Sequence, residues 1–410
     1  MNWFETLVFQ PGVAQSVLLI SVVISLGLIL SHLRIKNISF GVTWILFVGI
    51  LAGQLGLQLD GEISHFAKEF GLILFIYSIG IEVGPGFFQS FKKGGILLNL
   101  LATAIVLMGT GMMVAMAKLT GESSASMIGV LYGAVTNTPG LGAAQQTFSD
   151  INGGAANPLY AQGYAVAYPL AVVGIILSIS FLKCFFRVDN KAEDTLFEAN
   201  ADRNGANLQR SNEQKAQAEM RPADSKSADV KPHLFFIFLG IALGVVLGMV
   251  PLTIPGIPVP IRLGLAGGPL IVSILISHFG PRIHIPTHTT KSANLMIREI
   301  GISLFMAAVG IGAGQGFLQT IMAGGYMWVI YGFVITVVPC IVTGIVARYC
   351  CHLSYYTIAG LISGAHTDPP ALAYSNSLCS DQQASIAYST VYPLTMFLRV
   401  LVAQVLVIVM

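Results

Sequence analysis

Long apolar runs separated by short polar breaks extend over almost the whole chain. A membrane-spanning helix needs roughly 20 apolar residues, and such runs occur in two groups of five. The first group lies near residues 12–33, 41–58, 70–90, 95–117 and 160–183. The second lies near residues 234–250, 263–279, 300–320, 326–347 and 385–410. The pattern predicts an all-α polytopic membrane protein with ten spanning helices.

Two further segments, 123–150 and 355–380, interrupt this pattern and resemble each other. Within them GVLYGAVTNTPGLG (129–142) aligns without a gap with GLISGAHTDPPALA (360–373). Two flanking blocks repeat in the same order: Glu69–Phe75 with Glu299–Phe305, and Tyr164–Leu170 with Tyr388–Leu394. The chain therefore contains two copies of one unit. A duplicated, broken helical element in an apolar chain is typical of secondary transporters.

A hydrophilic segment separates the two copies. Nine of the nineteen acidic residues and seven of the twenty-one basic residues fall between residues 189 and 231. Few apolar residues and no sustained period occur there, which predicts a disordered linker. We therefore divide the chain into a first membrane repeat (1–187), a cytoplasmic linker (188–232) and a second repeat (233–410).

Composition excludes most other classes of protein. The chain is 54% hydrophobic and 10% charged, whereas soluble domains are about 25% charged. A net charge of +2 gives no indication of nucleic-acid binding. The five cysteines have no metal-ligand spacing, and the sequence contains no HExxH, GxSxG or P-loop motif. We expect no enzyme activity, no cofactor and no metal site.

Loop charges distinguish two topologies, in which the broken segments either cross the membrane or return as re-entrant hairpins. With hairpins, ten loop bases and the linker lie on one side and three bases lie on the other. The positive-inside rule makes the first side cytoplasmic. Crossing segments would weaken this bias, because Lys183 and Arg187 would move outside. We predict hairpins, with both termini outside. Because five spans per repeat is an odd number, the repeats are expected to be inverted.

Polar tips mark the predicted hairpins, at Thr136-Asn137-Thr138-Pro139 and Thr367-Asp368-Pro369-Pro370. Each proline is suited to start a second half-helix and pushes the preceding residue out of helical geometry. We place the second half-helices at Pro139 and Pro370, so that their positive ends face the break and suit an anion. Gly140 leaves room for close backbone approach. Tight kinks used only for packing are the alternative.

Two charged residues at membrane depth are further candidates. Asp368 stands where the first copy has Asn137, and it could bind Na⁺, carry a proton or meet an amino group. His366, two residues earlier, could tune a protonation step or be structural. Arg399, in the last apolar run, is expected to face the bundle interior. It could hold a substrate carboxylate bidentately or pair with Asp368 or Glu82.

Three more residues are candidates for gating or coupling. Glu82 lies near the cytoplasmic end of the third apolar run, where a snorkelling or capping role is the alternative. Tyr168 and Tyr392 precede matched prolines in the two copies, and their hydroxyl groups could reach a central cavity.

At these motifs the chain resembles the aspartate:alanine exchanger family of bacterial transporters. The resemblance rests on Gly80–Phe88, on Gly133–Ala144 and on the duplicated Tyr-Pro segments, and it covers both membrane halves. It implies an inverted-repeat permease of the bacterial inner membrane, with exchange of aspartate for alanine as the known activity. Many family members carry paired regulatory domains of the TrkA-C type in the cytoplasmic loop, where this chain has only the short linker.

Together these features predict a secondary transporter of a small anionic or zwitterionic metabolite, an amino acid or a dicarboxylate. We expect exchange by elevator-type alternating access, and by analogy with elevator proteins we expect a homodimer. An H⁺- or Na⁺-coupled symporter is the first alternative, and a channel-like or sensory membrane protein is the second.

Overall fold

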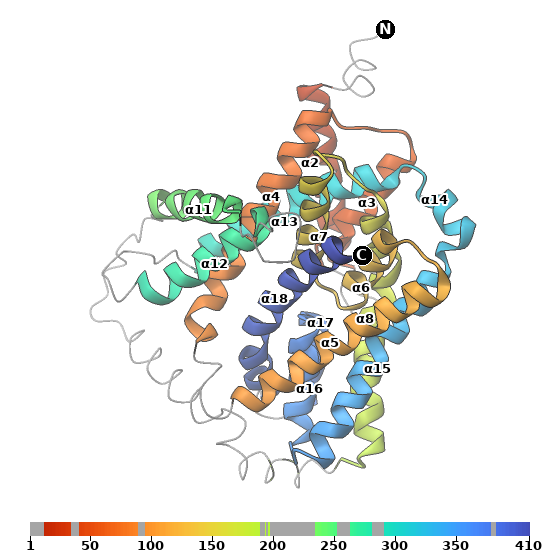
Figure 1. Ribbon diagram of the computed structural model, residues 1–410, viewed down its shortest axis with the longest axis vertical. Helices are drawn as coiled ribbons and strands as arrows, with labels where there is room; N and C mark the ends of the chain where they lie inside the picture. The colour runs from red at the N-terminus through yellow and green to blue at the C-terminus, as the bar shows by residue number, and fades with distance from the viewer. Residues whose placement is uncertain are drawn as a thin grey trace.

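The protein is entirely helical in the part described by a computed structural model, which covers residues 12–33, 41–88, 95–188, 193, 196, 234–251, 263–280, 291–378 and 383–410 (Figure 1). The first half contains α2 (Val13–Ser31), α3 (Thr43–Gln54), α4 (Gly61–Phe87), α5 (Gly95–Thr120), α6 (Ser124–Ala134), α7 (Thr138–Ile151) and α8 (Leu159–Phe185). The second half contains α11 (Leu234–Met249), α12 (Gly264–Phe279), α13 (Lys291–Gly314), α14 (Phe317–Thr320), the π-helical turn η3 (Ile321–Gly325), α15 (Met327–Tyr349), α16 (Tyr355–Ala365), α17 (Pro369–Ser377) and α18 (Gln383–Val409). The all-α prediction is confirmed.

Six of these helices are long and apolar enough to cross a membrane by themselves: α2, α5, α8, α13, α15 and α18. The shorter α3, α11 and α12 also fall on predicted spans but contain only 12, 16 and 16 residues. Helix α4 has 27 residues but carries several charged side chains along its length. Ten spans therefore stays a prediction, while six candidate spans are present among the described residues.

Helices α4 and α13 cross each other and run antiparallel. Ser78, late in α4, accepts a hydrogen bond from the side chain of Asn294, early in α13 (3.0 Å). At the crossing, a Cβ atom on Gly71 would lie 2.8 Å from the Gly301 carbonyl oxygen, and one on Gly301 would lie 2.7 Å from the Gly71 oxygen. Only glycine at both positions permits this approach, so the duplicated block supplies both sides of the crossing.

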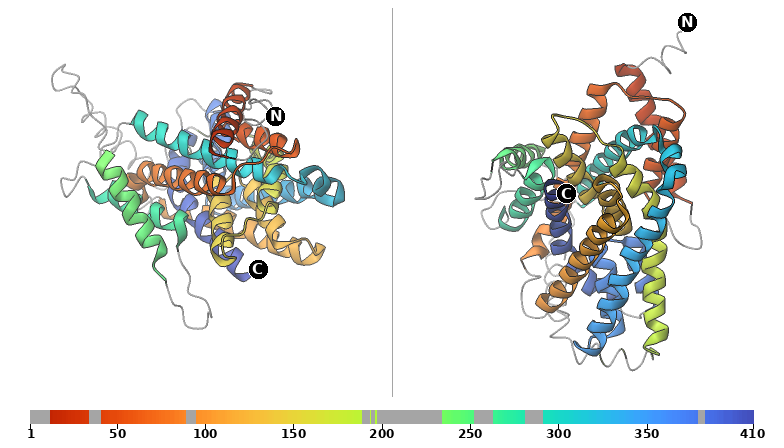
Figure 2. Two further views of the ribbon diagram at one scale, coloured as in Figure 1. Left: turned by 90° about the horizontal axis from the view of Figure 1, so that it is seen from above. Right: turned by 45° about the vertical axis from the view of Figure 1, so that its right-hand side comes forward.

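Each crossing helix packs against a short helix through the small residues of its GxxxG spacing. Gly84 of α4 approaches Ile274 of α12, and Gly310 of α13 approaches Leu46 of α3, with carbonyl oxygens 2.7 and 2.6 Å from the position of an added Cβ. Helix α11 lies beside α12 at one side of the molecule (Figures 1 and 2). These contacts place the two halves in an intertwined rather than a side-by-side arrangement.

The two broken segments form helical pairs whose limbs lie side by side. In the second pair, the hydroxyl groups of Ser363 in α16 and Ser375 in α17 are 3.1 Å apart. In the first pair, both limbs reach Tyr160 of α8. The Phe148 ring of α7 lies 5.6 Å from the Tyr160 ring, and a Cβ on Gly129 of α6 would lie 3.0 Å from the Tyr160 Cα. The second limbs start one residue earlier than predicted, at Thr138 and Pro369, because Asn137 and Asp368 occupy the N-cap positions.

The helical pairs rest against opposite ends of α8 and α18. The first pair starts beside the chain terminus, where the Ser124 hydroxyl donates to the Met410 carbonyl (3.3 Å). The second pair rests on the end of α8: Tyr355 donates to the Ile179 carbonyl (3.0 Å), and the Tyr374 hydroxyl lies 2.6 Å from that of Ser180. Both pairs therefore extend toward the middle of the bundle from opposite ends.

The predicted linker lies outside the described residues except for Val188, Glu193 and Leu196. Glu193 is only 1% exposed. Its carboxylate accepts two hydrogen bonds from the Arg348 guanidinium (2.5 and 3.1 Å) and one from the Tyr355 amide, at the first turn of α16 (2.7 Å). The start of the linker is thus anchored at the base of the second helical pair.

Candidate functional site

The two tips have the same backbone geometry. Helix α6 ends in a Schellman motif, in which the Asn137 amide donates to the Tyr132 carbonyl (2.9 Å) and the Thr136 amide donates to the Gly133 carbonyl (3.0 Å). Helix α16 ends identically at Thr367 and Asp368. Both threonines are left-handed, with φ of 52° and 54°. A β-branched residue is strained in this region, and such strain clusters at functional sites.

The residue that caps the second limb differs between the tips. The Asn137 side chain accepts from the Gly140 amide (2.8 Å) and donates to the Thr367 hydroxyl (3.1 Å). A Cβ on Gly140 would lie 2.7 Å from the Asn137 oxygen, so glycine is required for this cap. Asp368 is 1% exposed, and neither of its oxygens has a hydrogen-bond partner of normal geometry among the described residues.

The tips contact each other head to head. The Thr136 hydroxyl donates to the His366 carbonyl (2.8 Å), which adds to the bond between Asn137 and Thr367. Asn137 also lies 3.5 Å from the Met396 sulfur in α18. Each of these two hydrogen bonds joins residues that are 230 positions apart in the chain, and Asp368 directly follows Thr367. The two tips thus share one small region at the middle of the bundle.

A cavity of about 390 Å³ opens beside these tips. It is lined by Gly41, Val42, Thr43, Phe75, Ile79, Thr136, Thr138, Pro139, Tyr168, Arg298, Glu299, Ile302, Thr367, Pro369, Pro370, Tyr392 and Met396. Residues of both tips, of the α4–α13 pair and of α18 meet around it. Because α7 and α17 both start at this cavity, their N-terminal ends present positive dipole ends toward it.

Eight of the residues predicted from the sequence line this cavity, namely Thr136, Thr138, Pro139, Thr367, Pro369, Pro370, Tyr168 and Tyr392. Asn137, Gly140 and Asp368 are buried and do not line the cavity. The tyrosines are arranged alike in the two copies, since the rings of Tyr164 and Tyr168 are 5.3 Å apart and those of Tyr388 and Tyr392 are 5.2 Å apart. The Tyr164 hydroxyl lies 2.9 Å from that of Thr138, which holds the first tip against α8.

Arg399 and His366 are buried outside the cavity lining. The Arg399 guanidinium donates to the Ala365 carbonyl from Nε (3.1 Å) and from a terminal nitrogen (2.5 Å). It therefore stabilises the carboxyl end of α16, where a cation is favoured. The His366 ring lies 2.9 Å from the Ile362 carbonyl and 3.6 Å from the Cys340 sulfur. In this arrangement both side chains hold the second tip in place.

The basic group in the cavity is Arg298, which is not among the site residues predicted from the sequence. Its guanidinium donates to the Glu82 carboxylate (2.7 Å), so Glu82 pairs with Arg298 and not with Arg399. Both side chains are partly exposed, at 30% and 47%. A signal is present in the sequence: Arg298 precedes Glu299 as Lys68 precedes Glu69, at the head of the duplicated block.

Comparison with known proteins assigns the chain to a family. A model described as a predicted permease membrane region of the aspartate–alanine exchanger type matches residues 19–184 and 236–408, which includes both tips. The chain belongs to this family of permeases. An uncharacterized transporter of Bacteroides fragilis is 41% identical, with 97% of this chain and 96% of the relative covered. An uncharacterized transporter of Bacteroides thetaiotaomicron is 36% identical with both chains fully covered.

More distant members of the family carry similar names. A putative transport protein of Glaesserella parasuis is 31% identical over 97% of this chain and 98% of its own length. These alignments run over 542 to 557 positions, whereas this chain has 410 residues, so the relatives contain more than a hundred residues without a counterpart in it. No solved structure matches the chain. A transporter embedded in the membrane of a bacterium is the class that the family, the relatives and the six apolar helices support.

Proposed function

We propose that this permease is a secondary active transporter that exchanges small anionic or zwitterionic metabolites by alternating access. The observation that carries the proposal is the meeting of two strained helical tips beside a cavity that holds one guanidinium group. Broken helices that present backbone groups at membrane depth are tolerated only within protein or beside water. Matched tips of this kind are the usual substrate site of inverted-repeat transporters.

The two halves form inverted repeats in this proposal, each with five spans and one re-entrant hairpin. Support comes from the positions of the helical pairs, since the first starts beside Met410 at the end of α18 and the second beside Ile179 near the end of α8. Further support is that α4 and α13, which carry the same duplicated block in the two halves, cross antiparallel at Gly71 and Gly301. Elevator-type movement of the hairpins against α4 and α13 then exposes the tips alternately to each side.

An acidic amino acid is the substrate class that the cavity fits best. Arg298 can bind a carboxylate through two parallel hydrogen bonds, and the amino ends of α7 and α17 favour the same charge. Glu299, on the same wall, offers a partner for an amino group. A volume of about 390 Å³ lies in the range of small-molecule sites. Aspartate, with two carboxylates and one ammonium group, matches this set of charges.

Ion coupling is a second candidate, favoured by Asp368. A buried carboxyl group without a hydrogen-bond partner is costly unless it binds a proton or a cation. The Ala371 amide interacts with it, but among the described residues no group bonds either oxygen with normal geometry. A symporter in which Asp368 carries H⁺ or Na⁺ would use this group, whereas a pure exchanger would not.

The predicted placement in the membrane completes the proposal. Both termini lie on the periplasmic side of the inner membrane, the linker lies in the cytoplasm, and two copies form a homodimer. With this topology Arg298 and its cavity face the cytoplasm, while Lys68 faces the periplasm. The placement follows the loop charges and the positive-inside rule.

Counterflow in proteoliposomes tests the function. Vesicles loaded with unlabelled aspartate and placed in labelled aspartate, without Na⁺ and at neutral pH, should accumulate label saturably. Arg298→Gln should raise the KM by about tenfold or more, the effect of losing one charge-assisted hydrogen bond. Lys118→Gln, an exposed lysine at the end of α5, is the matched control and should leave the KM unchanged.

The same assay separates the two candidates. Uptake that requires internal counter-substrate and no ion gradient supports exchange. Uptake that appears only with an imposed Na⁺ or proton gradient, and that Asp368→Asn abolishes, supports the symporter. Absence of saturable uptake of aspartate, alanine and dicarboxylates under every gradient would refute the proposed function.

A further inference from the structure

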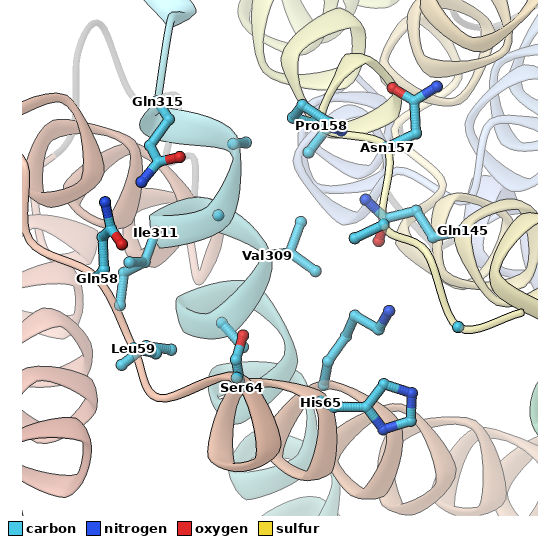
Figure 3. A pocket seen from close by; sticks show the side chains of 18 residues that line it. Gln58, Leu59, Ser64, His65, Gln145, Asn157, Pro158, Val309, Ile311 and Gln315 are labelled. Carbon is cyan, nitrogen blue, oxygen red and sulfur yellow. The ribbon is translucent and has the colours of Figure 1, made fainter. Parts of the chain in front are cut away.

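A second cavity of about 340 Å³ lies at the opposite end of the α4–α13 pair (Figure 3). Its walls come from the amino-terminal part of α4, the carboxyl-terminal part of α13 and the connection between α7 and α8. None of the hairpin-tip residues lines it. Gln145, its contribution from α7, is seven residues beyond Thr138, a distance of about 10 Å along a helix.

The internal repeat relates the basic residues of the two cavities, Lys68 in this one and Arg298 in the first. The first cavity is lined by Arg298 and Ile302 of α13 together with Phe75 and Ile79 of α4. The second is lined by Lys68 of α4 together with Ala308, Val309 and residues 311–313 of α13. Because Lys68 and Arg298 precede the matched glutamates of the duplicated block, each cavity holds the basic residue of one repeat.

An apolar barrier separates the two cavities. Leu72 and Phe305, both at most 2% exposed, lie on the stretches of α4 and α13 between the two linings. Both pack onto α7 at Gly142, where an added Cβ would lie 3.3 Å from the Phe305 ring and closer still to Leu72. A solute at the tips therefore reaches the second cavity only if α7 moves along this barrier.

The lining of the second cavity is suited to an anion. Figure 3 shows the amide groups of Gln58 and Gln315 on one wall, Gln145 and Asn157 on the other, and His65 below them. The Lys68 ammonium lies 3.4 Å from the Glu69 carboxylate, but Glu69 is not among the lining residues, and no other acidic residue is.

We propose that this cavity is the opposite vestibule of the transport pathway, in which Lys68 takes the substrate carboxylate that Arg298 holds on the other side. The inference rests on the proposed function, because it assigns a second station to the same anionic substrate. The amides and His65 supply hydrogen bonds, and Lys68 supplies the charge. The vestibule opens to the membrane face opposite to the one that the Arg298 cavity reaches.

Cysteine labelling tests this without depending on transport. Ser64→Cys places a thiol in the second cavity and Val42→Cys places one in the first. Each is treated with membrane-impermeant anionic or cationic methanethiosulfonates, in right-side-out and in inverted membrane vesicles. Peptide mass spectrometry reads each site separately, so the exposed native Cys184 and Cys350 do not interfere.

We expect Ser64→Cys to react in right-side-out vesicles only and Val42→Cys in inverted vesicles only. The anionic reagent should be preferred at Ser64→Cys, and adding Lys68→Gln should lower the ratio of anionic to cationic rates by about fivefold, as expected for a unit charge a few ångströms away. Lys118→Gln is the control and should leave the ratio unchanged.

Reaction of both cysteines from the same face would overturn the proposal, as would a rate ratio that does not respond to Lys68→Gln. A sided, Lys68-dependent preference for the anionic reagent would support it, even in a protein that exchanges no aspartate. In that case only the substrate assigned under the proposed function would fail. If millimolar aspartate slows the labelling of Ser64→Cys, the result would also support an acidic amino acid as the ligand of this cavity.

Discussion

Substituting the N-cap residue of each hairpin shows whether that residue serves the stability of the tip or transport. Asn137 and Asp368 hold the same position in two copies of one motif, but only Asn137 has its side-chain hydrogen bonds satisfied. Asp368→Asn places at the second tip an amide that can accept from the Ala371 amide as Asn137 accepts from Gly140. Asn137→Asp is the mirror change: it removes the donor to Thr367 and adds a buried carboxyl group.

The expected sizes follow from these contacts. A buried polar group without a partner costs about 1–3 kcal/mol, and one hydrogen bond contributes about 1 kcal/mol. Asp368→Asn should therefore raise the free energy of unfolding by about 2 kcal/mol in the absence of Na⁺. For a chain of 410 residues, 1 kcal/mol corresponds to about 1 °C in Tm, so Tm should rise by about 2 °C. Asn137→Asp should lower it by a similar amount or more.

Thermal unfolding of the purified protein in detergent, with counterflow measured on the same preparations, provides the assay. If Asp368 serves transport, Asp368→Asn should give a more stable protein whose counterflow rate is at least about tenfold lower. The reason is that residues kept for function often reduce stability, so replacing one stabilises the protein and impairs its activity. A Tm that falls with Asp368→Asn, or that does not change with Asn137→Asp, would show that the hydrogen bonds of these caps do not determine the stability of the tips.

Further predictions concern contacts that hold the hairpins. Glu193→Ala should lower the free energy of unfolding by about 2 kcal/mol, because it leaves the Arg348 guanidinium without its carboxylate; denaturant titration in detergent measures this, and adding Arg348→Ala should cost little more. Gly142→Ala should lower the counterflow rate at least about tenfold while the protein stays folded, since a methyl group there meets Leu72; adding Leu72→Ala should restore part of the rate. Tyr132→Phe removes a 2.8 Å bond to the Arg399 carbonyl and should lower Tm by about 1 °C, whereas an unchanged Tm would show that this bond does not hold the first hairpin.

Local chemistry makes much of the fold predictable. Apolar runs locate the helices because membrane helices satisfy their own backbone groups and need little tertiary information. The tips are predictable because proline disfavours helical geometry at the residue before it and is suited to the first turn of a new helix. The predicted start of the second limb, at Pro139 and Pro370, is wrong by one residue because Asn137 and Asp368 occupy the N-cap positions, so that helical geometry begins at Thr138 and Pro369.

The cavity cannot be predicted in the same way. It exists because α4 and α13 cross antiparallel at Gly71 and Gly301, and a linear pattern does not say which helices cross. The sequence favours Arg399 over Arg298 because depth in an apolar run indicates a buried arginine but not what it bonds. The partner of Arg399 is a carbonyl group of a helix end, which depends on the tertiary position of α16.

The sharing of α8 and α18 between the two helical pairs has a consequence for biosynthesis. The first pair is made before α18, yet it contacts α18 through Tyr132 and the residue that follows this helix through Ser124. Until α18 is made, the first pair packs on α8 and, at Gly142, on Leu72 of α4 and Phe305 of α13. The 27 residues of α18 therefore complete the packing of the first pair, and a chain that lacks this helix would leave the first pair open to degradation by membrane quality control.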